Sequence, residues 1–372
     1  MHLPMSSPDI SQAEIDAVNA VLRTPYLSIG QQVKEFEQRV AEYIGVRHAI
    51  AVSSGTAGLH LAVIAAGITE GDEVITTPFS FVASANCILY ERATPVFVDI
   101  DPHTLNIDPT LIEQAITPRT KAILPVHAFG QPADMDSILD IARRHYLYVI
   151  EDACEAIGAE YKGRKAGDLG DVGVFAFYPN KQMTTGEGGI IVTNNDEWDA
   201  LFRSLRNQGR DLFDAWLNHS RLGYNYRLDE LSAALGVAQI TRLEELLQKR
   251  ERVAHMYNDR LRDIPGVCVL YLAGATTRMS WFVYVIRLAG HIDRNQVMAD
   301  LEQHGIPSRP YFSCIHLQPF YQKRYGFKPG EFKAAESIAH STLALPFYGN
   351  MSEAEVAYVC KGLQSAIERR LG

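Results

Sequence analysis

The sequence predicts an α/β protein with a large domain built on a mainly parallel seven-stranded sheet and a smaller C-terminal α+β domain. The chain has 372 residues, 47% of them hydrophobic, which is enough to bury a large core and long enough for two domains. Between residues 48 and 193, short apolar runs rich in β-branched residues alternate with helical segments. Such runs are typical of strands covered by helices on both faces. After Leu228 the sequence becomes more charged and more helical.

The predicted strands of the large domain are the apolar runs at residues 48–53, 73–77, 96–100, 122–127, 148–152, 172–177 and 189–193. Between them, apolar residues at helical spacing predict helices such as 58–66 and 134–144. The last two strands are joined only by the loop 178–188, which is too short for a helical crossover. We therefore expect one of these two strands to run antiparallel to its neighbours.

The C-terminal third begins with the longest amphipathic stretch of the chain, residues 229–262, which predicts one long helix. Two strands are predicted beyond it, at 267–271 and 281–287, and then two helices, at 294–305 and 352–369. These elements predict a smaller α+β domain. We place the boundary near residue 245, with a large domain of residues 1–245 and a small domain of residues 246–372.

Composition argues against several classes of protein. The net charge of −9 disfavours nucleic-acid binding, which needs an excess of Lys and Arg. The five cysteines are scattered without a CxxC pair, so neither a zinc site nor a disulfide framework is expected, and we expect them to be reduced and buried. The N-terminus lacks the features of a signal peptide, and the longest apolar run, residues 57–68, is too short to span a membrane. These features predict a cytoplasmic protein.

Lys181 is the strongest functional signal in the sequence. It follows an apolar strand and precedes the glycine-rich run Gly186-Glu-Gly-Gly189. A lysine at the end of a buried strand is costly unless its nitrogen is used, and lysine amines bind aldehyde cofactors covalently.

Asp152 ends a second strongly apolar strand. Its carboxylate suits the protonated nitrogen of a pyridine ring, although a helix N-cap or a structural ion pair is an equally good interpretation of this residue alone. Together the two residues predict a pyridoxal phosphate (PLP) site.

Other segments that follow predicted strands suit the same cofactor. Ser53-Ser-Gly-Thr56 opens a helix, where free backbone N–H groups attract a phosphate, although Ser and Thr are also ordinary N-caps. Phe79 and Phe81 could stack on a planar ring or lie in the core, and we expect one of each. His127 follows another strand and is interpreted mainly as loop structure. Ligands of α/β sheets bind at the carboxyl ends of the strands, where these segments converge.

At these residues the chain resembles the DegT/DnrJ/EryC1/StrS family of sugar aminotransferases, which are PLP enzymes of fold type I, the aspartate aminotransferase fold. The resemblance runs almost from end to end. Its motifs, in chain order, are Leu27-Ser-Ile-Gly30, Phe36-Glu37, Ser54-Gly-Thr56, Pro78-Phe-Ser-Phe81, Val98-Asp-Ile-Asp101, Glu151-Asp-Ala153, Asn180-Lys181 with Thr185-Gly-Glu-Gly-Gly189, Gly223-Tyr-Asn-Tyr-Arg227, and His316-Leu-Gln-Pro-Phe-Tyr321.

The resemblance implies a role for each candidate site residue. For the cofactor it implies that Gly55 and Thr56 hold the phosphate, that Phe81 stacks on the ring, that Asp152 pairs with the ring nitrogen, that Glu155 lies beside the ring and that Lys181 is the point of covalent attachment. It also implies that Asn225 reaches the phosphate bound by the neighbouring subunit, so that the active sites lie at the interface of a homodimer. Tyr311, His316 and Arg227 are the implied substrate contacts.

Two positions depart from the family pattern. Ala176 stands where many relatives carry a serine that bonds the phosphate, so the grip on the cofactor is expected to depend more on Thr56 and Asn225. Glu155 stands where relatives often carry His or Gln, and a solvated carboxylate is the alternative interpretation. Retention of Lys181 disfavours the dehydratase branch of the family, in which this lysine is replaced by histidine.

The predicted reaction moves an amino group from L-glutamate to the keto group of a nucleotide-linked deoxysugar, in the biosynthesis of an amino sugar for a surface polysaccharide or a natural product. The sequence Thr184-Thr-Gly-Glu-Gly188 looks more like relatives that act at C4 than at C3. Alternatives are another keto acceptor such as a cyclitol ketone, a dehydratase-like elimination, or a PLP-binding regulator without turnover. The last is disfavoured because no DNA-binding module or basic face is evident.

Overall fold

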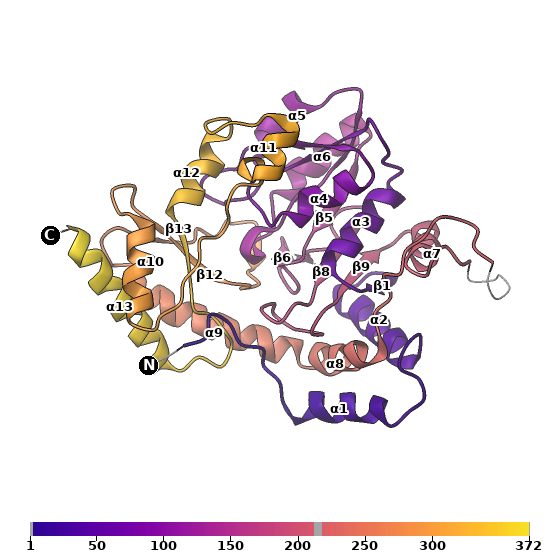
Figure 1. Cartoon of the computed structure of the whole chain (residues 1–372), viewed down its shortest axis with the longest axis horizontal. Coiled ribbons are helices and arrows are strands. Elements are labelled where there is room, and N and C mark those ends of the chain that lie inside the picture. The colour runs from indigo at the N-terminus through magenta and orange to yellow at the C-terminus, as the bar shows by residue number, and fades with distance from the viewer. Residues whose placement is uncertain (1–2, 212–217, 372) are drawn as a thin grey trace.

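The computed structural model describes residues 3–211 and 218–371 (Figure 1). Its centre is a seven-stranded sheet in the order β1-β9-β8-β5-β4-β2-β3. The strands are β1 (His48–Val52), β2 (Glu73–Thr76), β3 (Thr94–Phe97), β4 (Thr120–Ile123), β5 (Tyr148–Asp152), β8 (Val172–Ala176) and β9 (Gly189–Thr193). β9 is antiparallel to both of its neighbours, and the other neighbouring strands are parallel. The predicted sheet and its antiparallel strand are therefore confirmed, with strand ends that differ by a few residues.

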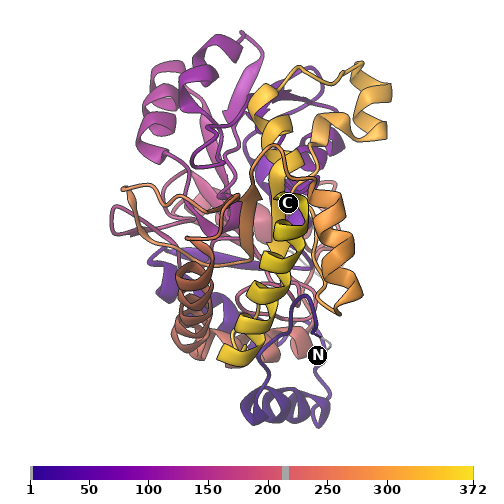
Figure 2. The ribbon, with the colours of Figure 1, turned by 90° about the vertical axis from the view of Figure 1, so that its left-hand side faces the viewer.

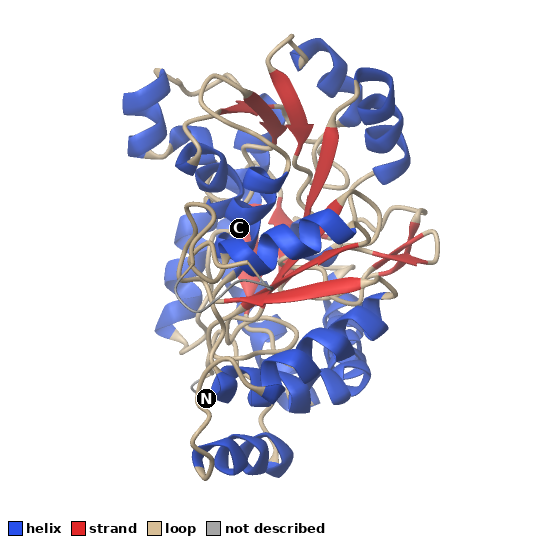
Figure 3. Cartoon of the chain, turned by 90° about the vertical axis from the view of Figure 1, so that its right-hand side faces the viewer, coloured by secondary structure: helices blue, strands red, loops and turns tan. Residues whose placement is uncertain are grey.

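Helices cover both faces of this sheet, and the strands lie between them (Figure 3). On one face, α3 (Gly55–Ala65), α4 (Ala83–Tyr90) and α7 (Asp196–Leu205) share a buried core with alternate strand residues such as Ile50 and Ile191. On the other face, α2 (Gln31–Ile44) and α8 (Glu230–Thr241) pack against the intervening residues such as Ala49 and Ile190, and α6 (Met135–His145) packs farther along the sheet. Apolar residues on both sides of each strand thus produce a three-layer α/β fold.

The single helix predicted over residues 229–262 is wrong. The stretch forms α8 and α9 (Leu243–Leu261), which are separated at Arg242, where φ is −104° and ψ is 6°. The Arg242 guanidinium bonds Glu14 at 2.9 Å and Asp9 at 3.2 Å. These contacts join the break to the N-terminal segment, more than 200 residues away in the chain, and the spacing of apolar residues does not reveal them.

The C-terminal part is built on a second, antiparallel sheet in the order β10-β12-β13, with β10 (Val267–Val269), β12 (Tyr284–Leu288) and β13 (Thr342–Leu345). Helices α10 (Arg294–Gln303) and α13 (Glu353–Leu371) pack together beside it (Figure 2). Leu3 lies in the core of this part, so the first described residues join the C-terminal elements. The predicted boundary after residue 245 falls within α9, whose residues contribute to the cores of both parts, and it stays a prediction.

The remaining elements are short or peripheral. They are α1 (Gln12–Leu22), α5 (Ile112–Ala115), α11 (Pro319–Tyr325), α12 (Lys333–Ser341) and the small sheet of β11 (Thr276–Arg278), β6 (Glu160–Tyr161) and β7 (Arg164–Lys165). Among the helices of the described residues, none has the length and apolar character that crossing a bilayer requires. All five cysteines are free thiols, but Cys268 is exposed, which corrects the expectation that all of them are buried.

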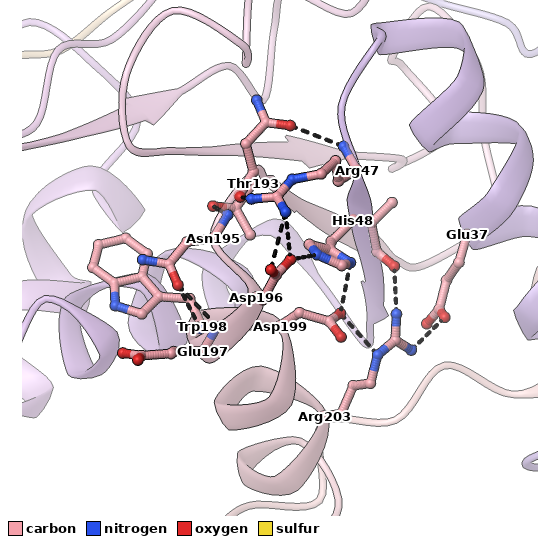
Figure 4. Close-up of polar contacts among 12 residues, drawn as sticks. Glu37, Arg47, His48, Thr193, Asn195, Asp196, Glu197, Trp198, Asp199 and Arg203 are labelled. Carbon is pink, nitrogen blue, oxygen red and sulfur yellow. Dashed lines mark hydrogen bonds and ion pairs between the residues drawn. The ribbon is translucent and has the colours of Figure 1, made fainter.

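A network of charged side chains fastens α7 to the edge of the sheet (Figure 4). Asn195 caps the helix by accepting hydrogen bonds from the next turn, and Asp196 accepts one from His48 at 2.6 Å. Deeper in the network, Arg203 donates to Glu37 at 2.7 Å, and Arg206 also bonds Glu37. Glu37 is 6% exposed, so it is a buried carboxylate that forms ion pairs with both arginines.

Replacing Glu37 with alanine is expected to lower the free energy of unfolding by about 3 kcal/mol, since it leaves two partly buried guanidiniums without their shared carboxylate. Arg47→Ala is the control, because the Arg47 side chain is 59% exposed where it pairs with Asp196. Such an exposed pair contributes less than about 1 kcal/mol. Urea unfolding of both variants measures the difference, and equal losses would contradict the prediction.

Candidate active site

A cavity of about 420 Å³ opens at the carboxyl edge of the central sheet, beside the ends of β5 and β8. Residues from α3, α4 and the loop after β8 line it, and Phe282, Tyr311 and Phe312 of the C-terminal part close its other side. The structure brings together here the predicted residues Gly55, Thr56, Phe81, Asp152, Glu155, Lys181 and Tyr311. Segments that are far apart in the chain thus converge where the strands of an α/β sheet end.

Lys181 extends into this cavity from the loop after β8. Its side chain is 13% exposed, and Nζ lies 3.9 Å from Oε1 of Glu155 and 3.9 Å from the centre of the Phe282 ring. The backbone N–H of Lys181 donates to the carbonyl of Tyr178 at 2.9 Å, which holds the turn that carries it. An ammonium group over an aromatic face is attracted by the ring electrons. The amine is therefore held inside the cavity, away from bulk solvent.

Asp152 lies at the carboxyl end of β5 and is 5% exposed. Its Oδ2 accepts a hydrogen bond of 2.6 Å from Oγ of Ser84, and its Oδ1 accepts one of 3.2 Å from the backbone N–H of Cys154. Ser80 in turn lies 2.8 Å from the Ser84 hydroxyl. These neutral donors orient the carboxylate without neutralising it, so it can still pair with a cationic N–H group.

Glu155 is 6% exposed, which excludes the alternative of a solvated carboxylate. Its Oε2 accepts a hydrogen bond of 2.9 Å from the backbone N–H of Phe129. Burial, with a smaller contribution from the nearby charge of Asp152, raises the pKa of Glu155 to about 7 against the opposing effects of Lys181 and the Phe129 hydrogen bond. A carboxyl group with such a pKa can hold or release a proton near neutral pH.

The raised pKa of Glu155 predicts a pH-dependent stability. The stabilisation from this group is complete below the ordinary pKa of 4.5 and is lost as the pH rises through about 7. Glu155→Gln cannot lose this proton, so we expect its stability relative to wild type to rise by about 2 to 3 kcal/mol between pH 5 and pH 8. Urea unfolding of the cofactor-free proteins at both pH values measures the change. Wild type and variant curves that shift in parallel would show that Glu155 does not titrate in this range.

The N-terminus of α3 forms the anion-binding end of the cavity. Ser54 caps the helix by accepting from the Ala57 N–H at 3.1 Å. Within the described residues, the N–H groups of Gly55 and Thr56 have no hydrogen-bond acceptor. A Cβ atom at Gly55 would lie 2.7 Å from Cβ of Ala176, so only glycine lets the helix start this close to β8. Free N–H groups and the helix dipole favour a phosphate at this end.

Two further observations fit a planar, polar ligand in the cavity. Phe79 is fully buried, whereas Phe81 is 62% exposed and lines the cavity, so the two phenylalanines have the different fates expected of them. The side-chain oxygen of Asn180, which also lines the cavity, is buried without a hydrogen-bond partner in the described part of the chain. A buried polar atom without a partner indicates a missing ligand or water. These residues, together with Lys181 and Asp152, fit PLP.

The structure does not bring three other predicted residues to this cavity. Asn225 is exposed and pairs through its backbone with Asn207, and Arg227 donates to the Asn207 side chain at 3.0 Å. His316 is fully buried; its Nε2 lies 3.1 Å from Glu336, and its ring packs against Phe332. A short 3₁₀ turn, Ile315–Leu317, turns His316 inward. Their predicted roles therefore rest on the resemblance alone.

Some site residues were missed by sequence reasoning. Ser84, which orients Asp152, lies 68 residues before it in the chain, and Phe282, which lies under the Lys181 amine, comes from the C-terminal part. Neither stands in a recognisable motif, because serine and phenylalanine are common in caps and cores. His127, interpreted as loop structure, is fully buried, and its Nε2 lies 2.8 Å from Oε2 of Glu151. It therefore has a structural role in the loop after β4.

A seven-stranded, mainly parallel sheet with a lysine and an aspartate facing one cavity at its carboxyl edge defines the class of PLP-dependent aminotransferases of fold type I. Within that class, the chain belongs to the DegT/DnrJ/EryC1/StrS aminotransferase family, whose sequence model matches residues 8–364.

Named relatives agree with this membership. The chain is 42% identical to a GDP-perosamine synthase of Caulobacter vibrioides over 98% of each chain. It is 39% identical to the spore coat polysaccharide biosynthesis protein SpsC of Bacillus subtilis, over 98% of this chain and 97% of that one. Among solved structures, Helicobacter pylori PseC, an aminotransferase involved in the biosynthesis of pseudoaminic acid, superposes with a TM-score of 0.94 at 30% identity and covers 99% of this chain, with 100% of its own chain matched.

Proposed function

We propose that the protein uses PLP to transfer an amino group from L-glutamate to the keto group of a nucleotide-linked deoxysugar, with a 4-keto acceptor favoured over a 3-keto acceptor. The observation that carries the proposal is the placement of Lys181 and Asp152 on one cavity with a helix N-terminus at its end. Relatives named for perosamine and for spore coat polysaccharide synthesis support an amino sugar of a surface polysaccharide as the product.

Different residues of the cavity would contact different parts of the cofactor. The N–H groups of Gly55 and Thr56 would hold its phosphate, Phe81 would stack on its ring, Asp152 would hold the ring nitrogen protonated, and Glu155 would lie beside the ring. When bound, PLP supplies an electron-withdrawing ring that accepts the charge left when a substrate proton is removed. Ala176 offers no hydroxyl to the phosphate, which leaves the helix N-terminus as its main contact within this chain.

The lysine amine is the base of the proposed reaction. Nζ of Lys181 would take the proton from the α carbon of L-glutamate and deliver it to the cofactor carbon to which this amine was attached. The Phe282 ring and Glu155 carboxyl, each 3.9 Å from Nζ, limit where the amine can move. Because the side chain is 13% exposed, little water competes for this proton.

A second cavity beside the first supports a long, two-part substrate. It has a volume of about 410 Å³ and shares Ser80, Phe81 and Phe312 with the first cavity. Its outer wall includes the exposed ring of Phe320 and the polar side chain of Gln318. If the keto sugar lies in the first cavity, its nucleotide would extend into the second one. There the apolar ring and the polar side chain of the wall suit a planar base with polar edges.

Amino-donor and acceptor assays test the function directly. L-glutamate with PLP-loaded protein should release 2-oxoglutarate, and addition of nucleotide-linked 4-keto sugars should give an amino sugar identified by mass spectrometry. Nucleotide-linked 3-keto sugars and a cyclitol ketone complete the panel. Turnover with the cyclitol ketone alone, or binding of PLP without any transfer, would contradict the proposed substrate class.

We also propose a homodimer whose active sites lie at the subunit interface, with Asn225 reaching the phosphate in the partner subunit. Exposure of Asn225 outside its own cavity supports this assignment. A subunit-mixing experiment tests it: Lys181→Ala and Asn225→Ala variants are each expected to be weakly active, and refolding them together should restore up to about a quarter of wild-type activity in mixed dimers. Mixtures no more active than the two separate variants would contradict a shared site.

A further inference from the structure

Arg250 is a buried cation whose charge no carboxylate neutralises directly. It lies on α9, is 4% exposed, and forms no ion pair with any described residue. Burial lowers the pKa of Arg250 to about 10, with only the nearby charge of Asp9 acting in the other direction. A buried charge is costly unless its donors are satisfied. The N–H groups of the buried guanidinium must therefore find hydrogen-bond acceptors among neutral groups.

The guanidinium of Arg250 donates to four backbone carbonyls on two segments. Nη2 bonds the carbonyls of Lys181 at 2.7 Å and Asn180 at 3.3 Å. Nη1 bonds the carbonyls of Phe282 at 3.1 Å and Trp281 at 3.4 Å. Both residues of the second segment precede β12, which begins at Tyr284 and not at the predicted residue 281.

The two segments are the two walls around the Lys181 amine. One carries the backbone of Lys181 itself, and the other carries the Phe282 ring, which lies 3.9 Å from Nζ. Gln182 makes a second link between the same walls, because its side chain donates to Oγ of Ser280 at 2.8 Å and to the carbonyl of Glu155 at 2.6 Å. The Arg250 guanidinium thus holds both the backbone of Lys181 and the segment that carries the Phe282 ring, over which Nζ lies.

We propose that Arg250 is a positioning residue for Lys181: by tying the Lys181 loop to the Trp281–Phe282 segment, it sets where the lysine amine lies in the cavity. The inference rests on the proposed role of Lys181. Displacement of a reacting group by about 1 Å can lower a rate by about 100-fold. Lysine keeps the charge but lacks the planar fork that reaches several acceptors, so Arg250→Lys removes the positioning and retains the cation.

A matched control stands two residues along the same helix. Arg252 also donates to backbone carbonyls, those of Gly349 and Met351, both at 3.1 Å. These carbonyls lie outside the residues that line the cavity. Arg252→Lys therefore removes comparable hydrogen bonds from α9 without touching the Lys181 loop.

The first measurement uses cofactor-free protein and needs no substrate. Each variant is labelled briefly with acetic anhydride over a range of pH, and mass spectrometry compares acetylation of Lys181 with that of the exposed Lys121. We expect Arg250→Lys to change the Lys181 to Lys121 ratio by at least about threefold, because an amine released from the Phe282 ring and Glu155 meets more water. Arg252→Lys should leave the ratio unchanged.

The second measurement uses PLP-loaded protein with L-glutamate and follows the release of the oxo acid product. Arg250→Lys should lower kcat by about 100-fold with KM changed less than about threefold, since the reacting amine and not the donor site is disturbed. Phe282→Leu, which keeps all backbone acceptors of Arg250, should shift the Lys181 labelling ratio in the same direction. If Arg250→Lys fails to fold, Arg250→Gln, whose shorter side chain cannot bond both segments, is labelled in its place, and a ratio equal to that of wild type would overturn the proposal.

The outcomes separate this inference from the proposed function. If both arginine variants lose thermal stability equally while Lys181 labelling and kcat match wild type, Arg250 is only structural and the proposal is overturned. If wild-type protein transfers no amino group but the labelling ratio responds to Arg250→Lys, the positioning role holds and the proposed function fails.

Discussion

Lys181→Ala is expected to lower the rate of the proposed amino transfer from L-glutamate by at least about 10⁴-fold, because the cavity would lose both its covalent attachment point and its base. The structure offers no replacement amine, since no other lysine lines the described cavity. Release of 2-oxoglutarate by PLP-loaded protein measures the rate. Borohydride treatment followed by mass spectrometry should find the cofactor on the peptide that contains Lys181 in wild type only.

The matched control for Lys181 is Lys165→Ala. The Lys165 ammonium also lies over an aromatic ring, 4.3 Å from the centre of Tyr43, and also pairs with a glutamate, Glu160, at 3.7 Å. It lies outside the cavity, so this variant should keep its amino transfer rate within about twofold of wild type. Normal turnover by Lys181→Ala, or an equal loss in Lys165→Ala, would refute the assignment.

Asp152→Asn is expected to lower the same rate by about 10³-fold while PLP still binds. Asparagine keeps the shape of the side chain but not the negative charge that holds a ring nitrogen protonated, and preorganised charges of this kind typically contribute factors of this size. Ser84→Ala removes the 2.6 Å hydrogen bond to Asp152 but keeps the carboxylate, so its rate should fall only about tenfold. Single-turnover measurements with L-glutamate compare the variants.

A second aspartate serves as the control for this prediction. Asp171 is exposed and accepts a hydrogen bond of 2.7 Å from the backbone N–H of Val149, and it lies at the opposite end of the strands, outside the cavity. Asp171→Asn should leave the transfer rate near that of wild type. A rate for Asp152→Asn within tenfold of wild type would mean that this carboxylate does not hold the ring nitrogen.

The pH behaviour of Glu155 follows from its burial beside the Lys181 amine. A glutamate whose pKa is raised to about 7 by burial can be neutral or charged in the working range, whereas glutamine cannot titrate. Its carboxyl lies 3.9 Å from the Lys181 amine, so a change in its charge is close enough to act on that amine electrostatically. The stability measurement on Glu155→Gln therefore also bears on the chemistry of the site.

The sequence by itself determined the central sheet and the two main residues of the site. Strand runs such as 148–152 and 189–193 carry their signal locally, in apolar side chains that must be covered on both faces. The short loop after β8 was enough to predict the antiparallel strand β9. Lys181 and Asp152 were predictable because Asp152 ends such a strand and Lys181 lies in the loop that follows another, and the carboxyl ends of neighbouring parallel strands meet at one edge of the sheet.

Only the tertiary structure decided what surrounds those two residues. Ser84 reaches Asp152, and Phe282 and Arg250 hold Lys181, through contacts between distant segments. At the break between α8 and α9, Arg242 likewise bonds a carboxylate of the N-terminal segment, Glu14. Periodicity and motifs describe a residue and its near neighbours, whereas a hydrogen bond between segments depends on how whole elements pack. The candidate residues Lys181 and Asp152 could therefore be predicted from the chain, but the contacts that position them could not.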